Sequence, residues 1–240
     1  MIEVEGLTRY YGDFAAVTDL SFRVAPGEVV GMLGPNGAGK TTTLRSLVGI
    51  IRPTRGKIRI CSHDLATDAI AAKQQLAFIP DEPQLFDHLT VREHLQFIAR
   101  IYNVEGSDSR IDELLGELDL RDKVDTLPDA LSRGMKQKLA IACGLLHDPR
   151  ALLLDEPLTG LDPGAIRRTK QTILNQAKRG AAVILSSHLL TLVEELCTRL
   201  IVIDHGKLVA MGTIDEIAAS KPELAGRGLE DLFLALTGSS

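Results

Sequence analysis

The loop GPNGAGKTT at residues 34–42 constrains the fold of this 240-residue chain more than any other stretch. Gly34, Gly39, Lys40 and Thr41 satisfy the spacing G-x-x-x-x-G-K-[ST]. The apolar run VVGML precedes the loop, and a helical pattern follows it. A glycine-rich turn between a buried strand and a helix is typical of sheets with parallel strands and helices on both faces. The sequence therefore predicts an α/β fold organised around this loop.

The residue types in the loop predict a phosphate-binding site. Glycines allow successive backbone N–H groups to point inward, and the N-terminus of the following helix adds the positive end of its dipole. Lys40 supplies a positive charge for the β- and γ-phosphates of a nucleotide, and Thr41 offers a hydroxyl oxygen to Mg²⁺. A chance glycine-rich turn is a poor alternative, because strand, loop and helix occur in the required order.

Two acids and a histidine follow other apolar runs. In ALLLDEP, Asp155 stands at the carboxyl end of a buried strand, where open α/β sheets bind their ligands. A carboxylate there can hold Mg²⁺, and Glu156 can orient or deprotonate a water molecule. His188 follows the run VIL in VILSSHLL and could reach a γ-phosphate at the same edge, although a lone histidine is more often structural.

The remaining pattern alternates strands with helices, apart from one helical stretch. Thr90 and Glu93 have capping-box spacing before an apolar face, and two further helical patterns follow before Pro149. We therefore expect a nucleotide-binding core of residues 1–83 and 150–240, with a mostly parallel sheet and a small antiparallel β subdomain. Residues 84–149 should form an inserted helical lobe.

Composition excludes several other classes of protein. The net charge is -5, aromatic residues make up 4% of the chain, and there is no Trp, so we expect no nucleic-acid partner. The three cysteines form no C-x-x-C pair, and His88 and His94 are poorly spaced for a shared metal. No apolar run reaches the roughly 18 residues of a membrane span. The N-K-x-D motif of guanine-specific sites is absent, which argues against a GTPase.

Taken together, the motifs resemble those of the ATP-binding cassette (ABC) ATPase subunits of membrane transporters, in order and over essentially the whole chain. Residues 34–42 resemble the Walker A loop, 152–156 the Walker B strand, and 131–137 (LSRGMKQ) the signature. Asp162 in TGLD resembles the D-loop aspartate, and His188 the switch histidine. The resemblance implies a P-loop NTPase fold, ATP hydrolysis with Glu156 and His188 as catalytic residues, and ATP and Mg²⁺ as cofactors.

The resemblance also assigns the residues that hold these cofactors. Tyr11 would stack on adenine, with Tyr10 as a rival, and Thr41, Asp155 and Asp81 would serve the metal. The other expected ATP-binding residues belong to the Walker A loop: Gly34, Asn36, Gly37, Ala38, Gly39, Lys40, Thr41 and Thr42.

In this family two subunits pair head to tail, and each signature closes on the ATP of the other. The resemblance thus implies a homodimer, or a pair with a related cassette, in which four signature residues meet the partner's ATP: Leu131, Ser132, Gly134 and Gln137. It also implies an integral membrane transporter subunit as partner and a cytoplasmic location, peripheral on the inner face of the cell membrane. The style of the motifs is more similar to exporters than to importers. A soluble cassette protein acting on ribosomes or DNA is the alternative.

Two positions depart from the family pattern. Arg133 replaces the first of the two signature glycines, and we favour simple tolerance over an added phosphate or partner contact, because Ser132 and Gly134 are intact. Asp81 occupies the place of a glutamine that in this family helps bind Mg²⁺ and water and links to the transporter partner. We expect Asp81 to sense the γ-phosphate site, and rank substitution by Gln84 lower.

Overall fold

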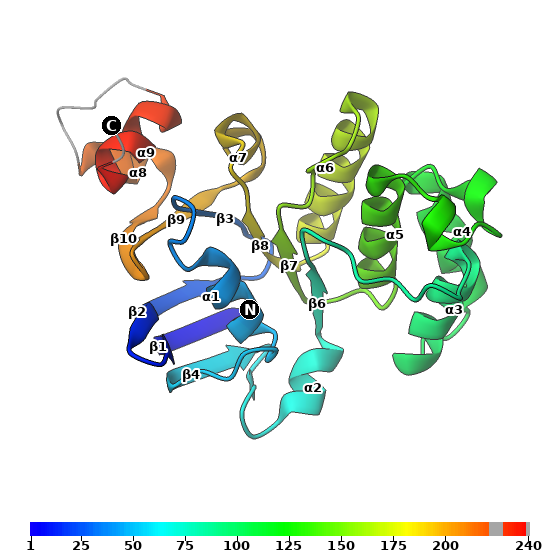
Figure 1. Cartoon of the computed structure of the whole chain (residues 1–240), viewed down its shortest axis with the longest axis horizontal. Coiled ribbons are helices and arrows are strands. Elements are labelled where there is room, and N and C mark those ends of the chain that lie inside the picture. Colours follow the sequence, from blue (N-terminus) through cyan, green and yellow to red (C-terminus); the bar gives the residue numbers. More distant parts are fainter. Residues whose placement is uncertain (221–227, 239–240) are drawn as a thin grey trace.

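A computed structural model describes residues 1–220 and 228–238 and contains two sheets, a helical lobe and a C-terminal helical pair (Figure 1). The larger sheet has the strand order β10-β9-β3-β8-β7-β6. Its strands are β3 (Val29–Leu33), β6 (Leu76–Ile79), β7 (Ala151–Asp155), β8 (Ala182–Ser186), β9 (Arg199–Asp204) and β10 (Lys207–Gly212). All neighbours are parallel except β9 and β10, which confirms the mostly parallel sheet predicted from the sequence.

The central strands are buried because both faces of this sheet are covered. Every residue of β3, β7 and β8 is buried, as continuous apolar runs in parallel sheets usually are. In β7 the side chains alternate between two cores. Leu152 and Leu154 pack with the lobe and with α6 and α7, whereas Ala151 and Leu153 pack with α1 and the smaller sheet. This double anchoring fixes the position of Asp155 at the end of β7.

The smaller sheet is antiparallel, with the order β2-β1-β4-β5. Its strands are β1 (Ile2–Tyr11), β2 (Phe14–Val24), β4 (Arg55–Ile60) and β5 (His63–Asp64). The antiparallel subdomain expected from the sequence is therefore present. The alternating pattern of residues 20–24 lies in β2, whereas β1, β5 and the short helix α2 (Ala69–Gln74) were not recognised individually from the sequence.

The helical lobe contains α3 (Val91–Ile101), α4 (Ser107–Glu117) and α5 (Arg133–Leu145), with two short 3₁₀ turns between α4 and α5. Its capping box forms as predicted: the Glu93 backbone N–H donates to Thr90 Oγ1, and the Thr90 backbone N–H donates to Glu93 Oε2. One hydrophobic core runs from this lobe into the large sheet. The division at residues 84–149 therefore stays a prediction, because α5 packs against β6 as well as against α3 and α4.

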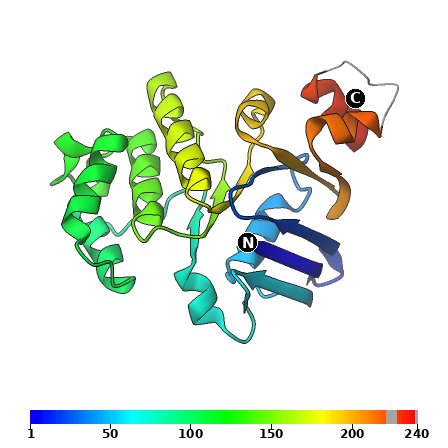
Figure 2. The ribbon, with the colours of Figure 1, turned by 180° about the vertical axis from the view of Figure 1, so that it is seen from behind.

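Five more helices complete the described fold: α1 (Lys40–Leu47), α6 (Pro163–Lys178), α7 (Leu190–Leu196), α8 (Ile214–Ala219) and α9 (Leu229–Thr237). Helices α8 and α9 pack beside β10, at the end of the molecule opposite the lobe (Figures 1 and 2). Asp162 and Thr213 cap α6 and α8 through their side chains, as their positions in the sequence predict. Among the described residues, no helix is both long and apolar enough to cross a membrane.

Candidate functional site

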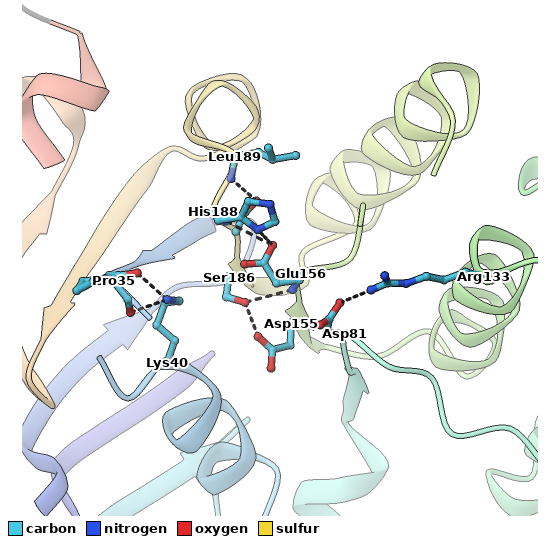
Figure 3. A network of polar contacts seen from close by, with 11 residues as sticks. Pro35, Lys40, Asp81, Arg133, Asp155, Glu156, Ser186, His188 and Leu189 are labelled. Atoms are coloured by element: carbon cyan, nitrogen blue, oxygen red, sulfur yellow. Dashed lines mark hydrogen bonds and ion pairs between the residues drawn. The ribbon is translucent and has the colours of Figure 1, made fainter. Parts of the chain in front are cut away.

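The carboxyl ends of neighbouring strands bring the predicted site residues together. Asp155 at the end of β7 is paired with Ser186 at the end of β8, and Ser186 is paired with Met32 of β3. The strands therefore end level with one another, and the loop that follows β3 begins beside them. Figure 3 shows Lys40, Asp155, Glu156 and His188 near this edge, with Lys40 turned to Pro35 and the Glu156 carboxylate turned to His188.

The phosphate loop is held in its shape by glycines that admit no side chain. A Cβ added to Gly34 would lie 2.2 Å from the carbonyl oxygen of Ile203. Gly39 has a φ of +102° at the start of α1, and a Cβ there would lie 2.6 Å from the Ala16 carbonyl oxygen. The loop therefore keeps its backbone bare for close contact with an anion.

The Lys40 side chain lies over this loop and donates to its backbone. Its Nζ donates hydrogen bonds to the carbonyl oxygens of Gly34 at 2.6 Å and Pro35 at 3.1 Å. Burial lowers the pKa of Lys40 from the usual lysine value, and the negative charges of Glu156 and Asp155 partly oppose that shift. A phosphate in the loop would add further negative charge beside the ammonium group and oppose the effect of burial.

Ser186 organises the two acids, and sequence reasoning missed it. Its hydroxyl donates to Asp155 Oδ1 at 2.5 Å, and its Oγ accepts a 3.2 Å hydrogen bond from the backbone N–H of Glu156. Asp155 is buried, with 6% of its surface exposed, so this contact fixes the direction of its carboxylate. The position of Ser186 directly after the apolar run AVIL was the signal available in the sequence.

Glu156 and His188 form a second contact at the edge. His188 Nδ1 lies 2.8 Å from Glu156 Oε2. An ionised carboxylate only accepts hydrogen bonds, so Nδ1 carries the proton and Nε2 is left on the exposed side of the ring. Glu156 has a φ of +50°, an uncommon conformation for a non-glycine residue, which turns the chain sharply after β7. The pair can hold a water molecule and accept a proton from it.

Tyr11 and the phosphate loop line one cavity of about 410 Å³. Tyr11 is 44% exposed, and the Arg9 guanidinium lies over its ring at 4.6 Å from the centroid. Tyr10 is not among the lining residues, so the geometry favours Tyr11 over its rival. Phe14, which pairs with Tyr11 across the β1–β2 hairpin, also lines the cavity and was not singled out from the sequence.

The predicted signature residues divide into two groups. Ser132 is exposed and caps α5 by accepting a hydrogen bond from the Met135 backbone N–H at 3.2 Å. Gly134 lies close to the D-loop, where an added Cβ would be 2.9 Å from the Gly160 carbonyl oxygen. Leu131 and Gln137 are buried, and Gln137 Nε2 donates to the Pro80 carbonyl oxygen at 3.5 Å. The side chains of Leu131 and Gln137 thus face the interior of their own chain, and their contact with a partner's nucleotide stays a prediction.

Asp81 and Asp162 have partners that the sequence did not reveal. Arg133 donates to Asp81 Oδ1 at 3.3 Å, so the two departures from the family pattern contact each other (Figure 3). Asp162 accepts a 2.9 Å hydrogen bond from the Ala165 backbone N–H, which holds the pKa of Asp162 below its usual range. Gln84 is exposed and its amide donates to the Glu82 carbonyl oxygen.

The donor set fits a triphosphate with Mg²⁺. Thr41, Asp81 and Asp155 line one cavity of about 820 Å³, which lies between the core and the lobe. Within the described residues, no cluster of three or more His, Cys, Asp or Glu side chains could hold a metal unaided. Mg²⁺ is usually bound by one or two carboxylates together with substrate phosphates and water. A hydroxyl and one oriented carboxylate beside a phosphate loop match that requirement.

The role of Ser186 gives a direct test of this geometry. Without its hydroxyl, Asp155 loses the hydrogen bond that directs its carboxylate. We expect Ser186→Ala to raise the Mg²⁺ concentration needed for half-maximal ATP hydrolysis about tenfold, at the lower end of the effect of removing such outer partners. Thr172→Val is the control, because Thr172 is also buried and donates only within α6, to the Arg168 carbonyl oxygen. An equal Mg²⁺ requirement in both variants would contradict the assignment.

Comparison with known proteins identifies the family of this chain. The family pattern described as "ABC transporter" matches residues 17–159. The ABC-type transporter ATP-binding protein EcsA of Bacillus subtilis is 34% identical over 239 residues, which cover 99% of this chain and 96% of EcsA. The Nod factor export ATP-binding protein I of Paraburkholderia xenovorans is 39% identical, over 92% of this chain and 73% of that protein.

A solved structure of an ATP-binding subunit of an ABC transporter is also similar, with a TM-score of 0.94 and 35% identity over 98% of this chain and 99% of that one. The match therefore extends over both sheets and the lobe, and not only over the phosphate loop. The chain belongs to the ABC transporter family and is the ATP-hydrolysing subunit of such a transporter.

Proposed function

We propose that two copies of this chain, or this chain and a related cassette, close head to tail around ATP and Mg²⁺. The division of the site supports this most strongly. The phosphate loop, Asp155 and Glu156 lie at the sheet edge, whereas Ser132 and Gly134 lie at the start of α5 in the lobe. In the described chain the Ser132 hydroxyl oxygen accepts only from Met135, so its O–H is left to donate to a phosphate brought by a partner.

Each chain supplies the main binding contacts for its own nucleotide. Tyr11 contacts the adenine, the loop of residues 34–39 surrounds the phosphates, and Lys40 exchanges its carbonyl partners for phosphate oxygens. Thr41 and Asp155 hold Mg²⁺, and Asp81 lies in the same cavity, where it senses the γ-phosphate. Mg²⁺ neutralises charge that develops on the phosphate oxygens when it is bound.

Hydrolysis requires a positioned base beside the γ-phosphate. Glu156 accepts the proton of the attacking water, and His188 keeps the Glu156 carboxylate turned toward that position through the 2.8 Å hydrogen bond. A base of this kind contributes roughly 10²–10⁴-fold to the rate. The sharp turn at Glu156 places its side chain one residue beyond the metal-binding Asp155, so the two acids have separate roles.

The nucleotide then controls the association of the subunits. With ATP bound, the Ser132 hydroxyl and the Gly134 N–H of one chain add donors to the γ-phosphate held by the other. After hydrolysis that phosphate is gone and the contact weakens, which is a ligand switch acting on an interface. Asp162 supports the interface indirectly, because it caps α6 immediately after the D-loop that packs on Gly134.

A membrane-embedded subunit would dock at the cavity between the core and the lobe. Phe86 is 53% exposed at the rim of this cavity and stacks edge-on against Phe97, which is also exposed. Leu85 instead packs against the hydrophobic core, so it belongs to the lobe boundary. An exposed aromatic pair beside a cavity suits an apolar segment of a partner protein.

We further propose that this assembly is an exporter and that the chain lies peripherally on the cytoplasmic face of the membrane. The Nod factor relative is named for export, which agrees with the exporter-like motifs. A soluble cassette acting on ribosomes or DNA is not favoured, because the relatives are named as transporter subunits. The net charge of -5 supports the absence of a nucleic-acid partner.

The dimer is tested with Glu156→Gln, which removes the base but keeps the shape of the side chain. We expect this variant to bind ATP, to lose at least about 100-fold in hydrolysis, and to sediment as a dimer with Mg²⁺ and ATP but as a monomer with ADP. A variant that remained a monomer at saturating ATP would contradict the shared site.

The docking surface is tested with Phe86→Glu. A charge at this exposed rim should release the chain from membranes that contain its co-expressed integral partner, while ATP hydrolysis by the purified chain stays within about twofold. Ile70→Glu is the matched control, because Ile70 is 77% exposed on α2. Membrane association that survived Phe86→Glu would place the docking surface elsewhere.

A further inference from the structure

The two residues that depart from the family pattern form an ion pair. Arg133 NH2 and Asp81 Oδ1 are 3.3 Å apart, although the residues are separated by 52 positions in the sequence. Arg133 is the first helical residue of α5, directly after the exposed Ser132. Asp81 follows the end of β6, where it lies in the same cavity as Thr41 and Asp155. The pair therefore links the signature of a chain to the cavity that contains Thr41 and Asp155 of the same chain.

The Arg133 side chain lies along the surface between these two points. Its Cγ and Cδ lie close to Gly160, where an added Cβ would be 3.4 Å and 3.2 Å away. Gly160 has a φ of +78°, so the D-loop turns beneath the aliphatic part of the arginine. The guanidinium extends beyond the D-loop to Asp81 (Figure 3). A bulkier residue at position 160 would displace it.

This contact is one that can open. The side chains are 58% exposed for Arg133 and 44% exposed for Asp81, and exposed ion pairs are weak because water and salt compete for both charges. A divalent cation bound at the neighbouring Thr41 and Asp155 would attract the Asp81 carboxylate more strongly than one guanidinium does. The guanidinium would then lose its partner while staying positively charged, because arginine does not deprotonate in proteins.

We propose that the Asp81–Arg133 pair is a latch that withholds Arg133 from the partner subunit's ATP until Mg²⁺ and ATP occupy the site of its own chain. Once Asp81 turns to the metal, Arg133 binds the γ-phosphate held by the other subunit, beside Ser132. A guanidinium suits this task because its N–H groups can contact two phosphate oxygens at once. The proposal rests on the head-to-tail dimer of the proposed function and assigns Arg133 a binding role.

The latch makes closure at one ATP site of the dimer depend on occupation of the other site. In a chain without Mg²⁺ and ATP, Arg133 stays paired with Asp81. The signature of that chain then binds the partner's ATP without the arginine, and so more weakly. A loaded chain releases the arginine and strengthens the contact with the second nucleotide. Occupation of one site would thus favour closure of the other. The contact that differs is that of Arg133, with Asp81 in the empty state and with the partner's γ-phosphate in the loaded state.

The binding role of Arg133 is tested by sedimentation velocity in the Glu156→Gln background. With Mg²⁺ and ATP, we expect Arg133→Ala to weaken dimerisation about tenfold, and Arg133→Lys to recover part of that loss by keeping the charge. Arg92→Ala is the matched control, because Arg92 also pairs with an aspartate, Asp112 at 2.9 Å, but within the lobe. Parental dimerisation by Arg133→Ala would overturn the proposal.

The latch itself is tested with ATP in EDTA, where Asp81 has no metal to bind. Asp81→Asn should tighten dimerisation several-fold, because the arginine is released without Mg²⁺. The double variant Asp81→Asn, Arg133→Ala should show no such gain over Arg133→Ala alone. An equal gain in both backgrounds would overturn the latch, since removal of a negative charge near ATP would then explain it. If the Glu156→Gln parent itself stayed monomeric with Mg²⁺ and ATP, the proposed dimer would fail instead.

Discussion

The structure depends on the level alignment of β3, β7 and β8 at their carboxyl ends. Parallel pairing brings the phosphate loop, Asp155 and Ser186 to one edge, and the apolar residues beneath them are buried on both faces of the sheet. A displacement of one strand by a single residue would reverse the direction of its side chains. The buried runs therefore determine where the hydroxyl, carboxylate and backbone N–H groups of the site lie.

The hydrogen bonds at this edge form a continuous series. Ser186 connects the Asp155 carboxylate to the backbone of Glu156, and Glu156 connects to His188. Each partner fixes the direction of the next, which preorganises the edge for charge that develops on a phosphate. The signature at α5 lies outside this series and contacts its surroundings through the D-loop, the Asp81–Arg133 pair and the hydrogen bond from Gln137 to Pro80. The sheet edge and the signature thus lie in separate parts of the chain.

Much of this could be predicted from the sequence, because the informative residues are close together along the chain. The loop of residues 34–42, the acids after ALLL and the caps at Thr90, Asp162 and Thr213 are all local patterns, and each forms the structure that its pattern predicts. The family followed from the order of these motifs. Strand β1 was less apparent, because its buried positions do not alternate regularly: the neighbours Leu7 and Thr8 are both buried.

Contacts between distant residues could not be predicted in the same way. Position 81 and position 133 each departed from the family pattern, but their pairing depends on how α5 packs against β6. The burial of Gln137 likewise follows from that packing and not from its neighbours in the sequence. Ser186 resembled an ordinary strand-end serine until the pairing of β7 and β8 placed it beside Asp155.

The central claim is that a working site takes its base from one chain and its signature from the other. Mixing two inactive variants tests it most directly: Glu156→Gln, with an intact signature, and Ser132→Phe, with an intact base. A mixed dimer contains one site with Glu156 from one chain and Ser132 from the other, so ATP hydrolysis should return on mixing. If the mixture remained as inactive as its components although mixed dimers formed, each chain would need its own base and signature together, and the account would be contradicted.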